Sequence, residues 1–259
     1  MTGVIVAGAA GRMGGRIMQA VLDYGDLELA GAFERPEHPE LGRDAGLAAG
    51  LGEIGIKLAG SLGDVLEAGE VIIDFTQPEA TLGNLEQAAK TGKAMVVGTT
   101  GFSAEETARI HDLSGNMRLV LAPNMSVGVN LLFKIVGDVA QVLKKGYDLE
   151  IVEAHHRLKK DAPSGTAMRL AEILAETTGR SLNECAVYGR QGIIGERPDD
   201  EIAVLSVRAG DIVGEHTVTF GGIGERLEIT HRAHSRDTFA RGAVRAASWI
   251  VNQSPGLYD

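Results

Sequence analysis

The chain has 259 residues with a hydrophobic content of 44%, which is enough for a packed core and for two modest domains. Its formal net charge of −10 argues against non-specific nucleic-acid binding. Because the sequence has no apolar run of about 18 residues, no signal-peptide pattern at its start and a single cysteine, Cys185, we expect a cytoplasmic protein without a membrane span, a disulfide or a cysteine metal cluster.

The first predicted strand, residues 2–7, is a β-branched run that ends in a Gly-rich turn. The turn has the spacing G-x-x-G-x-x-G, and the residues after it have helical periodicity. Such a turn lets the backbone approach a pyrophosphate, although glycines also serve ordinary tight turns. Its position between the first strand and the first helix favours a dinucleotide site. The candidate contacts are Gly8, Ala9, Ala10, Gly11, Arg12 and Met13.

The second predicted strand, residues 27–33, ends at Glu34 and Arg35. Glu34 lies 20 residues after Gly14, where a dinucleotide fold places the acid that binds the adenosine ribose hydroxyls. Arg35 can pair with the 2′-phosphate that distinguishes NADPH. NADH and NADPH are therefore both candidate cofactors. The alternative is an exposed Glu–Arg pair in a polar loop.

The rest of the first half alternates between strands and helices after an irregular loop. We expect the loop at 36–52, strands at 54–58, 71–74, 94–97 and 119–121, and helices at 63–68, 78–90 and 103–113. This alternation predicts a doubly wound parallel sheet of the Rossmann type, with ligands at the carboxyl ends of its strands. Turn residues there are further candidate cofactor contacts, although ordinary turn chemistry selects similar residues. They are Gly98, Thr99, Thr100, Ala122, Pro123, Asn124 and Met125.

The second half predicts an α+β domain with a mixed, open sheet. We expect helices at 126–143 and 167–176, strands at 147–156, 202–209, 215–220 and 226–231, and hairpin turns at 210–211 and 221–225. The last helix, 235–251, is predicted to return to the first domain. The domains are then 1–126 with 236–259, for dinucleotide binding, and 127–235, for substrate binding and oligomerisation.

A basic segment at residues 155–160 stands out in this acidic chain. Five of its six residues are His, Arg or Lys, and the predicted helix start at Pro163-Ser164-Gly165-Thr166 follows it. Basic side chains and a helix N-terminus both attract anions, although a solvated turn is the plainer alternative. Successive strand residues face opposite ways, so His155 and His156 can both face a ligand only if the strand has ended.

The sequence around this segment resembles the 4-hydroxy-tetrahydrodipicolinate (dihydrodipicolinate) reductase family. The resemblance rests on Glu150, Ile151, Glu153, His155, Lys159 and the run Asp161-Ala162-Pro163-Ser164-Gly165-Thr166-Ala167. Further blocks are 8–14, 98–102, 122–130 and 208–216, so nearly the whole chain is covered. One departure is Leu158, where some members carry another His.

The resemblance implies an NADH- or NADPH-dependent reductase of the diaminopimelate–lysine route, acting on a cyclic dicarboxylate. It implies that His155 and Lys159 are catalytic and that His156, Ser164, Gly165 and Thr166 contact the substrate. It also implies a homotetramer. The apolar run at 203–205 also favours an oligomer. Too few helices are predicted to cover both faces of its sheet, and an uncovered apolar face indicates an interface.

Three other functions remain open from the residues alone. A related enzyme could reduce a different small anion. A non-enzymatic dinucleotide sensor would need the Gly-rich turn but no clustered acid–base residues. A metallohydrolase is the least favoured, because the adjacent His155 and His156 lack the i, i+4 spacing of a helical zinc pair, and we expect no metal.

Overall fold

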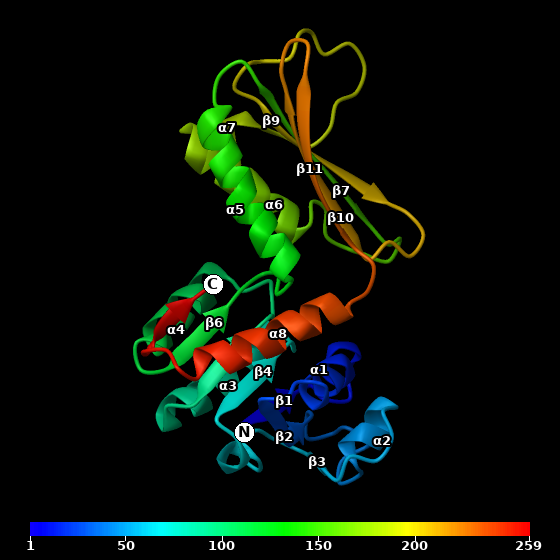
Figure 1. The fold of residues 1–259 in the computed structure, drawn as a ribbon, viewed down its shortest axis with the longest axis vertical. Coiled ribbons are helices and arrows are strands. Elements are labelled where there is room, and N and C mark those ends of the chain that lie inside the picture. Colours follow the sequence, from blue (N-terminus) through cyan, green and yellow to red (C-terminus); the bar gives the residue numbers. More distant parts are fainter. The chain divides into compact units, whose positions relative to one another are not determined.

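The computed structural model describes residues 1–259, and these form two compact units (Figure 1). Unit 1 comprises Met1–Ser126 and Arg236–Asp259, and unit 2 comprises Val127–Ser235. The predicted fold class is confirmed, because unit 1 has a parallel sheet between helices and unit 2 has a mixed sheet. None of the helices is long and apolar enough to span a membrane.

Unit 1 is built on a parallel seven-stranded sheet in the order β12-β6-β5-β4-β1-β2-β3. Its inner strands are apolar on both faces, as expected when helices cover both sides of a parallel sheet. Between β3 and β4 the chain crosses from one half of the sheet to the other, which places the topological switch point beside β1. The strands are β1 (Thr2–Ala7), β2 (Leu27–Phe33), β3 (Leu58–Ala59), β4 (Val71–Asp74), β5 (Ala94–Val97), β6 (Arg118–Leu121) and β12 (Gly256–Tyr258).

Two helical layers enclose this sheet. On one face α1 (Arg12–Leu22), α2 (Ala45–Ala49) and α8 (Asp237–Ile250) build one apolar core. On the other face α3 (Pro78–Thr91) and α4 (Ala104–Ser114) build a second. The sequence sets the ends of these helices. Pro78 begins α3 and the left-handed Gly92 ends it, while Ser103 and Glu106 form a capping box for α4.

Three predictions for the first half were wrong: the strand at 54–58, the irregular loop at 36–52 and the helix at 63–68. Only Leu58–Ala59 pairs with β2, because Asp44 accepts the amide hydrogens of Ile54 and Gly55 at 3.2 and 2.7 Å and so removes them from a strand ladder. The same carboxylate caps α2, a helix that lies within the predicted irregular loop. The expected helix at 63–68 is reduced to a single 3₁₀ turn, Leu66–Ala68.

Unit 2 contains a mixed five-stranded sheet in the order β11-β10-β7-β9-β8. The long helices α5 (Val127–Val142) and α6 (Gly165–Thr178) pack together, and their apolar side chains share one core with the sheet. A short helix, α7 (Leu182–Cys185), leads into the edge strand β8. The strands are β7 (Asp148–His155), β8 (Ala186–Val187), β9 (Ile202–Arg208), β10 (Gly214–Gly221) and β11 (Arg226–Ala233).

One of the two predicted hairpins is wrong. β10 and β11 pair antiparallel around the turn at 221–225, as predicted. β9 and β10 do not pair, because β7 lies between them, parallel to β9 and antiparallel to β10. The segment at 210–211 therefore crosses the end of β7, where the amide of Ala209 donates to the carbonyl of His155 at 2.9 Å. This crossing brings the end of β9 beside the end of β7.

Candidate active site

The Gly-rich turn of unit 1 follows β1 and lies beside the residues that follow β2 and β4. Gly8 follows β1 with a positive φ of 62°. A Cβ atom on Gly8 would lie 2.9 Å from Thr76 Cγ2 and 3.6 Å from Glu34 Oε1, so the backbone is closely enclosed there. Gly8 and Glu34, predicted from sequence as parts of one site, are thus adjacent in space.

The start of α1 is arranged to receive an anion. A Cβ atom on Gly14 would lie 2.2 Å from the Gly8 carbonyl oxygen, so only glycine lets α1 approach the strand end this closely. The N-cap residue is Gly11, which has no side chain that could cap the first amides of α1. Uncapped amides at a helix start fit a pyrophosphate, and the helix dipole adds to this. These residues therefore fit a dinucleotide cofactor.

A buried aspartate organises the turns after β4 and β5. Asp74 is fully buried and accepts hydrogen bonds from the Thr76 amide at 2.9 Å and from Asn84 Nδ2 at 2.8 Å. The Thr81 hydroxyl also donates to Asp74. Its oxygen lies 2.8 Å from the hydroxyl oxygen of Thr99, which is one of the predicted cofactor contacts. This network was not predicted, because it joins residues from two different turns. It fixes the edge on which a cofactor would rest.

The remaining predicted cofactor turns also lie at this edge. A Cβ atom on Gly98 would lie 2.3 Å from the Phe75 ring, so the ring rests directly on that turn. After β6, Asn124 Oδ1 accepts from the Ser126 amide at 2.9 Å. Gly242 of α8 packs so closely that a Cβ atom there would lie 1.7 Å from the Met125 carbonyl oxygen. The turns after β1, β2, β5 and β6 thus line one edge of the sheet.

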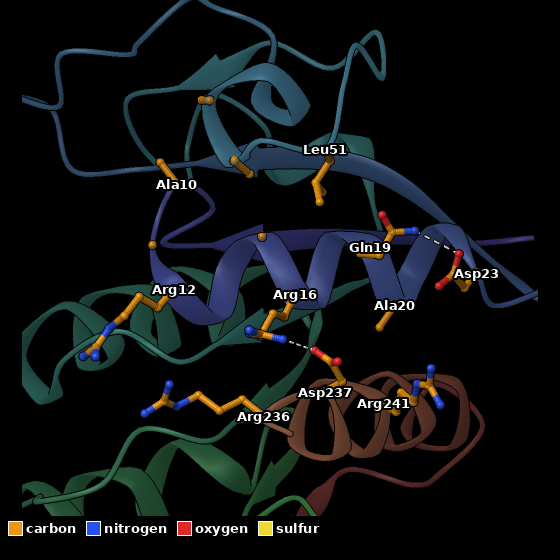
Figure 2. A pocket seen from close by; sticks show the side chains of 14 residues that line it. Ala10, Arg12, Arg16, Gln19, Ala20, Asp23, Leu51, Arg236, Asp237 and Arg241 are labelled. Atoms are coloured by element: carbon orange, nitrogen blue, oxygen red, sulfur yellow. Dashed lines mark hydrogen bonds and ion pairs between the residues drawn. The ribbon is translucent and has the colours of Figure 1, made fainter. Parts of the chain in front are cut away.

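A pocket of about 610 Å³ runs along α1 from the Gly-rich turn. Figure 2 shows side chains of α1 and α8 facing it, with an ion pair between Arg16 and Asp237. Four arginines and two aspartates line the pocket, which leaves a positive surplus in a chain of net charge −10. Such a surplus attracts anions to the neighbouring turn. Its arginines are Arg12, Arg16, Arg236 and Arg241.

In unit 2, the predicted catalytic segment begins where β7 ends. The strand's last residue, His155, is buried, while His156 lies beyond the strand and is half-buried. The strand therefore ends between the two histidines, so strand alternation no longer dictates opposite directions for their side chains. His156 accepts the Lys159 amide on its carbonyl at 3.1 Å and so closes a turn. Lys159 Nζ pairs with Asp161 at 2.9 Å.

Glu153 occupies the centre of a buried polar cluster. It is fully buried, and its Oε2 lies 2.5 Å from His155 Nδ1. Arg208, at the end of β9, donates from both terminal nitrogens to the two carboxylate oxygens at 2.8 and 2.7 Å. The amide of Ser164 donates to Oε1 at 3.1 Å. The carboxylate is thus held from three sides.

A second histidine completes this cluster. His216 on β10 is 3% exposed, and its Nε2 lies 3.1 Å from Ser164 Oγ. Its ring stands edge-on to the His155 ring, with 5.2 Å between centroids. Ser164 Oγ also accepts from the Ala167 amide at 3.2 Å and so caps α6. The predicted substrate contacts Gly165 and Thr166 form the first turn of that helix.

Burial and hydrogen bonding shift the pKa values of three titratable groups in this cluster, Glu153, His155 and His216. Burial alone would raise the pKa of Glu153, but hydrogen bonds from Arg208 and Ser206 outweigh burial and lower the pKa to about 2. Burial lowers the pKa of His155 below its ordinary value, although Glu153 acts in the opposite direction. Burial lowers the pKa of His216 to about 3. Glu153 is therefore ionised and His216 neutral at pH 7.

Sequence reasoning placed no role on Glu153, Arg208, His216 or Asp74. The signal for Glu153 was present, because it lies two residues before His155 and so faces the same side of the strand. Arg208 and His216 reach the cluster only through the pairing of β7 with β9 and β10. The structure contains no group of three or more His, Cys, Asp or Glu side chains arranged to hold a metal ion.

Comparison with known proteins matches the whole chain to one family. The profile "Dihydrodipicolinate reductase, N-terminus" covers residues 2–125, and "Dihydrodipicolinate reductase, C-terminus" covers residues 128–259. Proteins named 4-hydroxy-tetrahydrodipicolinate reductase from Citrifermentans bemidjiense and Geobacter sp. (strain M21) are 56% and 55% identical, over 100% of this chain and 97% of theirs.

Solved structures agree with this match. A dipicolinate-bound dihydrodipicolinate reductase from Paenisporosarcina sp. TG-14 is 25% identical and superposes with a TM-score of 0.77, covering 99% of this chain and 97% of its own. An amine dehydrogenase from Mycobacterium smegmatis, 14% identical, covers 99% of this chain and 94% of its own with a TM-score of 0.63. The second likeness concerns the fold alone.

Proposed function

The chain belongs to the dihydrodipicolinate reductase family, and from this premise we propose which of its residues perform the reaction. The protein is an NAD(P)H-dependent oxidoreductase. It transfers hydride to a cyclic dicarboxylate of the dihydrodipicolinate type, giving tetrahydrodipicolinate in diaminopimelate and lysine biosynthesis.

Unit 1 holds the cofactor. The amides at the start of α1 bind the pyrophosphate, and Glu34, beside Gly8, binds the adenosine ribose. The turns after β5 and β6 receive the nicotinamide end. The bound cofactor supplies a hydride. The arginine-lined pocket along α1 raises the local concentration of the anionic cofactor.

Unit 2 holds the substrate and supplies the proton. The observation that carries this assignment is the buried contact between Glu153 and His155, which stands beside Lys159 and the start of α6. Hydride addition to a conjugated C=C–C=N system leaves negative charge on the ring. His155, when protonated, and Lys159 neutralise that charge, while the α6 start and His156 bind the two substrate carboxylates.

We expect both cofactors to be used, with KM values within about tenfold of each other. The Glu34 carboxylate favours NADH and repels the 2′-phosphate of NADPH, while the exposed Arg35 attracts it. Glu34→Ala should therefore weaken NADH more than NADPH, and Arg35→Ala the reverse. The measurement is kcat/KM for both cofactors, with Glu37→Ala as a control in the same loop. Equal losses for both cofactors in each variant would assign these residues to loop support only.

We also propose a homotetramer assembled through unit 2. The helices cover one face of its sheet, and the other face presents a row formed by Thr230, Thr217, Val152 and Leu205 across four neighbouring strands. Val152 is 38% exposed and nearby Val207 is 44% exposed, which is unusual for a sheet face that stays in water. Ile193, in the segment after β8, is fully exposed.

Light scattering should give the mass of four copies of the 27.2 kDa chain at micromolar concentration. Val152→Glu should shift the mass towards smaller species, because a charge on that face would have to lose its water on association. Leu22→Glu places the same charge on an exposed leucine of unit 1 and should leave the mass unchanged. A stable wild-type monomer would refute the tetramer.

A further inference from the structure

The contact between Glu153 and His155 fixes which ring nitrogen carries hydrogen. Glu153 is ionised, and each of its oxygens already accepts hydrogen bonds from Arg208. An ionised carboxylate oxygen is only an acceptor, so an unprotonated Nδ1 at 2.5 Å would set two lone pairs against each other. Nδ1 must therefore carry a hydrogen in the neutral and in the charged ring.

The opposite nitrogen, Nε2, is the one left for chemistry. It makes no hydrogen bond within the protein. It is not fully buried, so solvent reaches it. Its neighbour is Gly214 at the start of β10, where a Cβ atom would lie only 3.1 Å from Nε2. Glycine at this position leaves the space beside Nε2 clear.

We propose that Glu153, clamped by Arg208, is the positioning residue of His155: it holds Nδ1–H, so that the transferred proton enters and leaves at Nε2. This inference rests on the proposed catalytic role of His155. Because Nδ1 always carries hydrogen, a proton at Nε2 makes the ring an imidazolium, and the adjacent carboxylate stabilises that cation. Arg208 keeps the carboxylate ionised and fixes its orientation through two parallel hydrogen bonds.

The charge on His155 is set by groups from every element around it. Glu153 on β7 favours the protonated ring, and Lys159, in the following turn, and Arg208 on β9 oppose it. Asp161 is paired with Lys159 and moderates its effect. His216 on β10 is neutral and contributes a ring edge rather than a charge. Glu153 is thus the one carboxylate in direct contact with the ring.

Glu153→Gln tests this arrangement with nearly the same shape. The amide oxygen is expected to take the place of Oε1, because the Ser164 amide and Arg208 can only donate there, whereas His155, at Oε2, can exchange tautomers. The NH₂ group then faces His155 Nδ1, and the hydrogen bond that Oε2 accepts from Arg208 is lost. The neutral ring should then switch to the tautomer with hydrogen on Nε2. Nitrogen-15 NMR of histidine-labelled protein reports the tautomer, with His155→Ala assigning the signal among the seven histidines.

In wild type we expect hydrogen on Nδ1 of neutral His155, and in Glu153→Gln hydrogen on Nε2. The same variant should lower kcat roughly tenfold or more, as expected when an orienting carboxylate is lost, with little change in NADH affinity. The limb of kcat that falls with rising pH should move to lower pH by roughly one unit, because a stabilising charge near the imidazolium is gone.

Two further variants separate positioning from simple structural support. Glu153→Asp retains the charge and should retain the Nδ1–H tautomer and a near-wild-type pH limb, even if its shorter reach reduces kcat. Glu150→Gln changes an ion-paired glutamate on the same strand, bound by Arg190 and Arg197, and should alter neither tautomer nor pH limb.

A wild-type His155 with hydrogen on Nε2 in its neutral ring would overturn the inference, whatever the enzyme's activity. An unshifted pH limb in folded Glu153→Gln would overturn it as well. Failure of the proposed catalytic role would be seen separately, as normal turnover by His155→Ala. The tautomer measurement needs no substrate, so the two failures are distinguishable.

Discussion

His155→Ala and Lys159→Ala are each expected to lower kcat by roughly a hundredfold or more, the usual scale for loss of a general acid. In the proposed mechanism His155 supplies a proton from a ring held by a buried carboxylate, and Lys159 provides a positive charge in the turn that follows. Both belong to unit 2, so NADH affinity, measured by fluorescence titration, should barely change. Wild-type kcat should fall as pH rises through the pKa of His155, which burial holds below its ordinary value.

Lys160→Ala is the matched control for this pair. Lys160 follows Lys159 directly, but its side chain is exposed and makes no ion pair. Its loss removes the same charge from the same turn and should change kcat by less than about threefold, since exposed charges in high dielectric contribute little. If Lys159→Ala kept near-full kcat while binding NADH normally, the role assigned to Lys159 would be wrong.

Gly14→Ala is expected to raise the KM for NADH roughly fivefold or more, since overpacking costs roughly 1–3 kcal/mol where the neighbours cannot yield. The added Cβ atom would lie 2.2 Å from the Gly8 carbonyl oxygen and 2.6 Å from Ala9 Cα. Both are backbone atoms of the turn proposed to bind the pyrophosphate. The helix or the turn must therefore move, and the amides proposed to bind the anion move with it.

Gly83→Ala provides the comparison, because a Cβ atom on this α3 glycine meets nothing within 4 Å. It should leave NADH binding unchanged and stabilise the protein by about 0.5–1 kcal/mol, the usual gain of Ala over Gly inside a helix. Thermal denaturation and NADH titration of both variants provide the test. Wild-type NADH affinity in folded Gly14→Ala would show that the turn does not bind the cofactor as proposed.

The architecture of unit 1 was predictable because its signals are local. Val4, Ile5 and Val6 are fully buried, as a run without polar residues predicts for an inner parallel strand. Ser103 and Glu106 lie three residues apart and form a capping box, a local signal, at the start of the helix predicted at 103–113. The error at 54–58 arose because a residue distant in sequence intervened. Asp44 accepts amide hydrogens ten and eleven residues away, and no periodicity in residues 54–57 reveals this.

The candidate site divides in the same way. The position of His155 and Lys159 near a helix start follows from a contiguous segment, so the sequence alone pointed to it. Two residues around His155, Arg208 and His216, come from β9 and β10. These strands pair with β7 because the segment at 210–211 crosses the end of β7, although its sequence predicts a hairpin turn. Arg208 and His216 therefore became recognisable only once the strand order was known.

Turnover by the wild-type protein tests the central claim most directly. Purified protein is mixed with NADH and the aldol product of pyruvate and aspartate semialdehyde, and the absorbance of the reduced nicotinamide is followed. We expect the absorbance to fall only when protein and aldol product are both present, and to fall at a rate proportional to the protein concentration. A protein that binds NADH, as fluorescence would show, yet leaves the absorbance unchanged would contradict the assignment as a reductase.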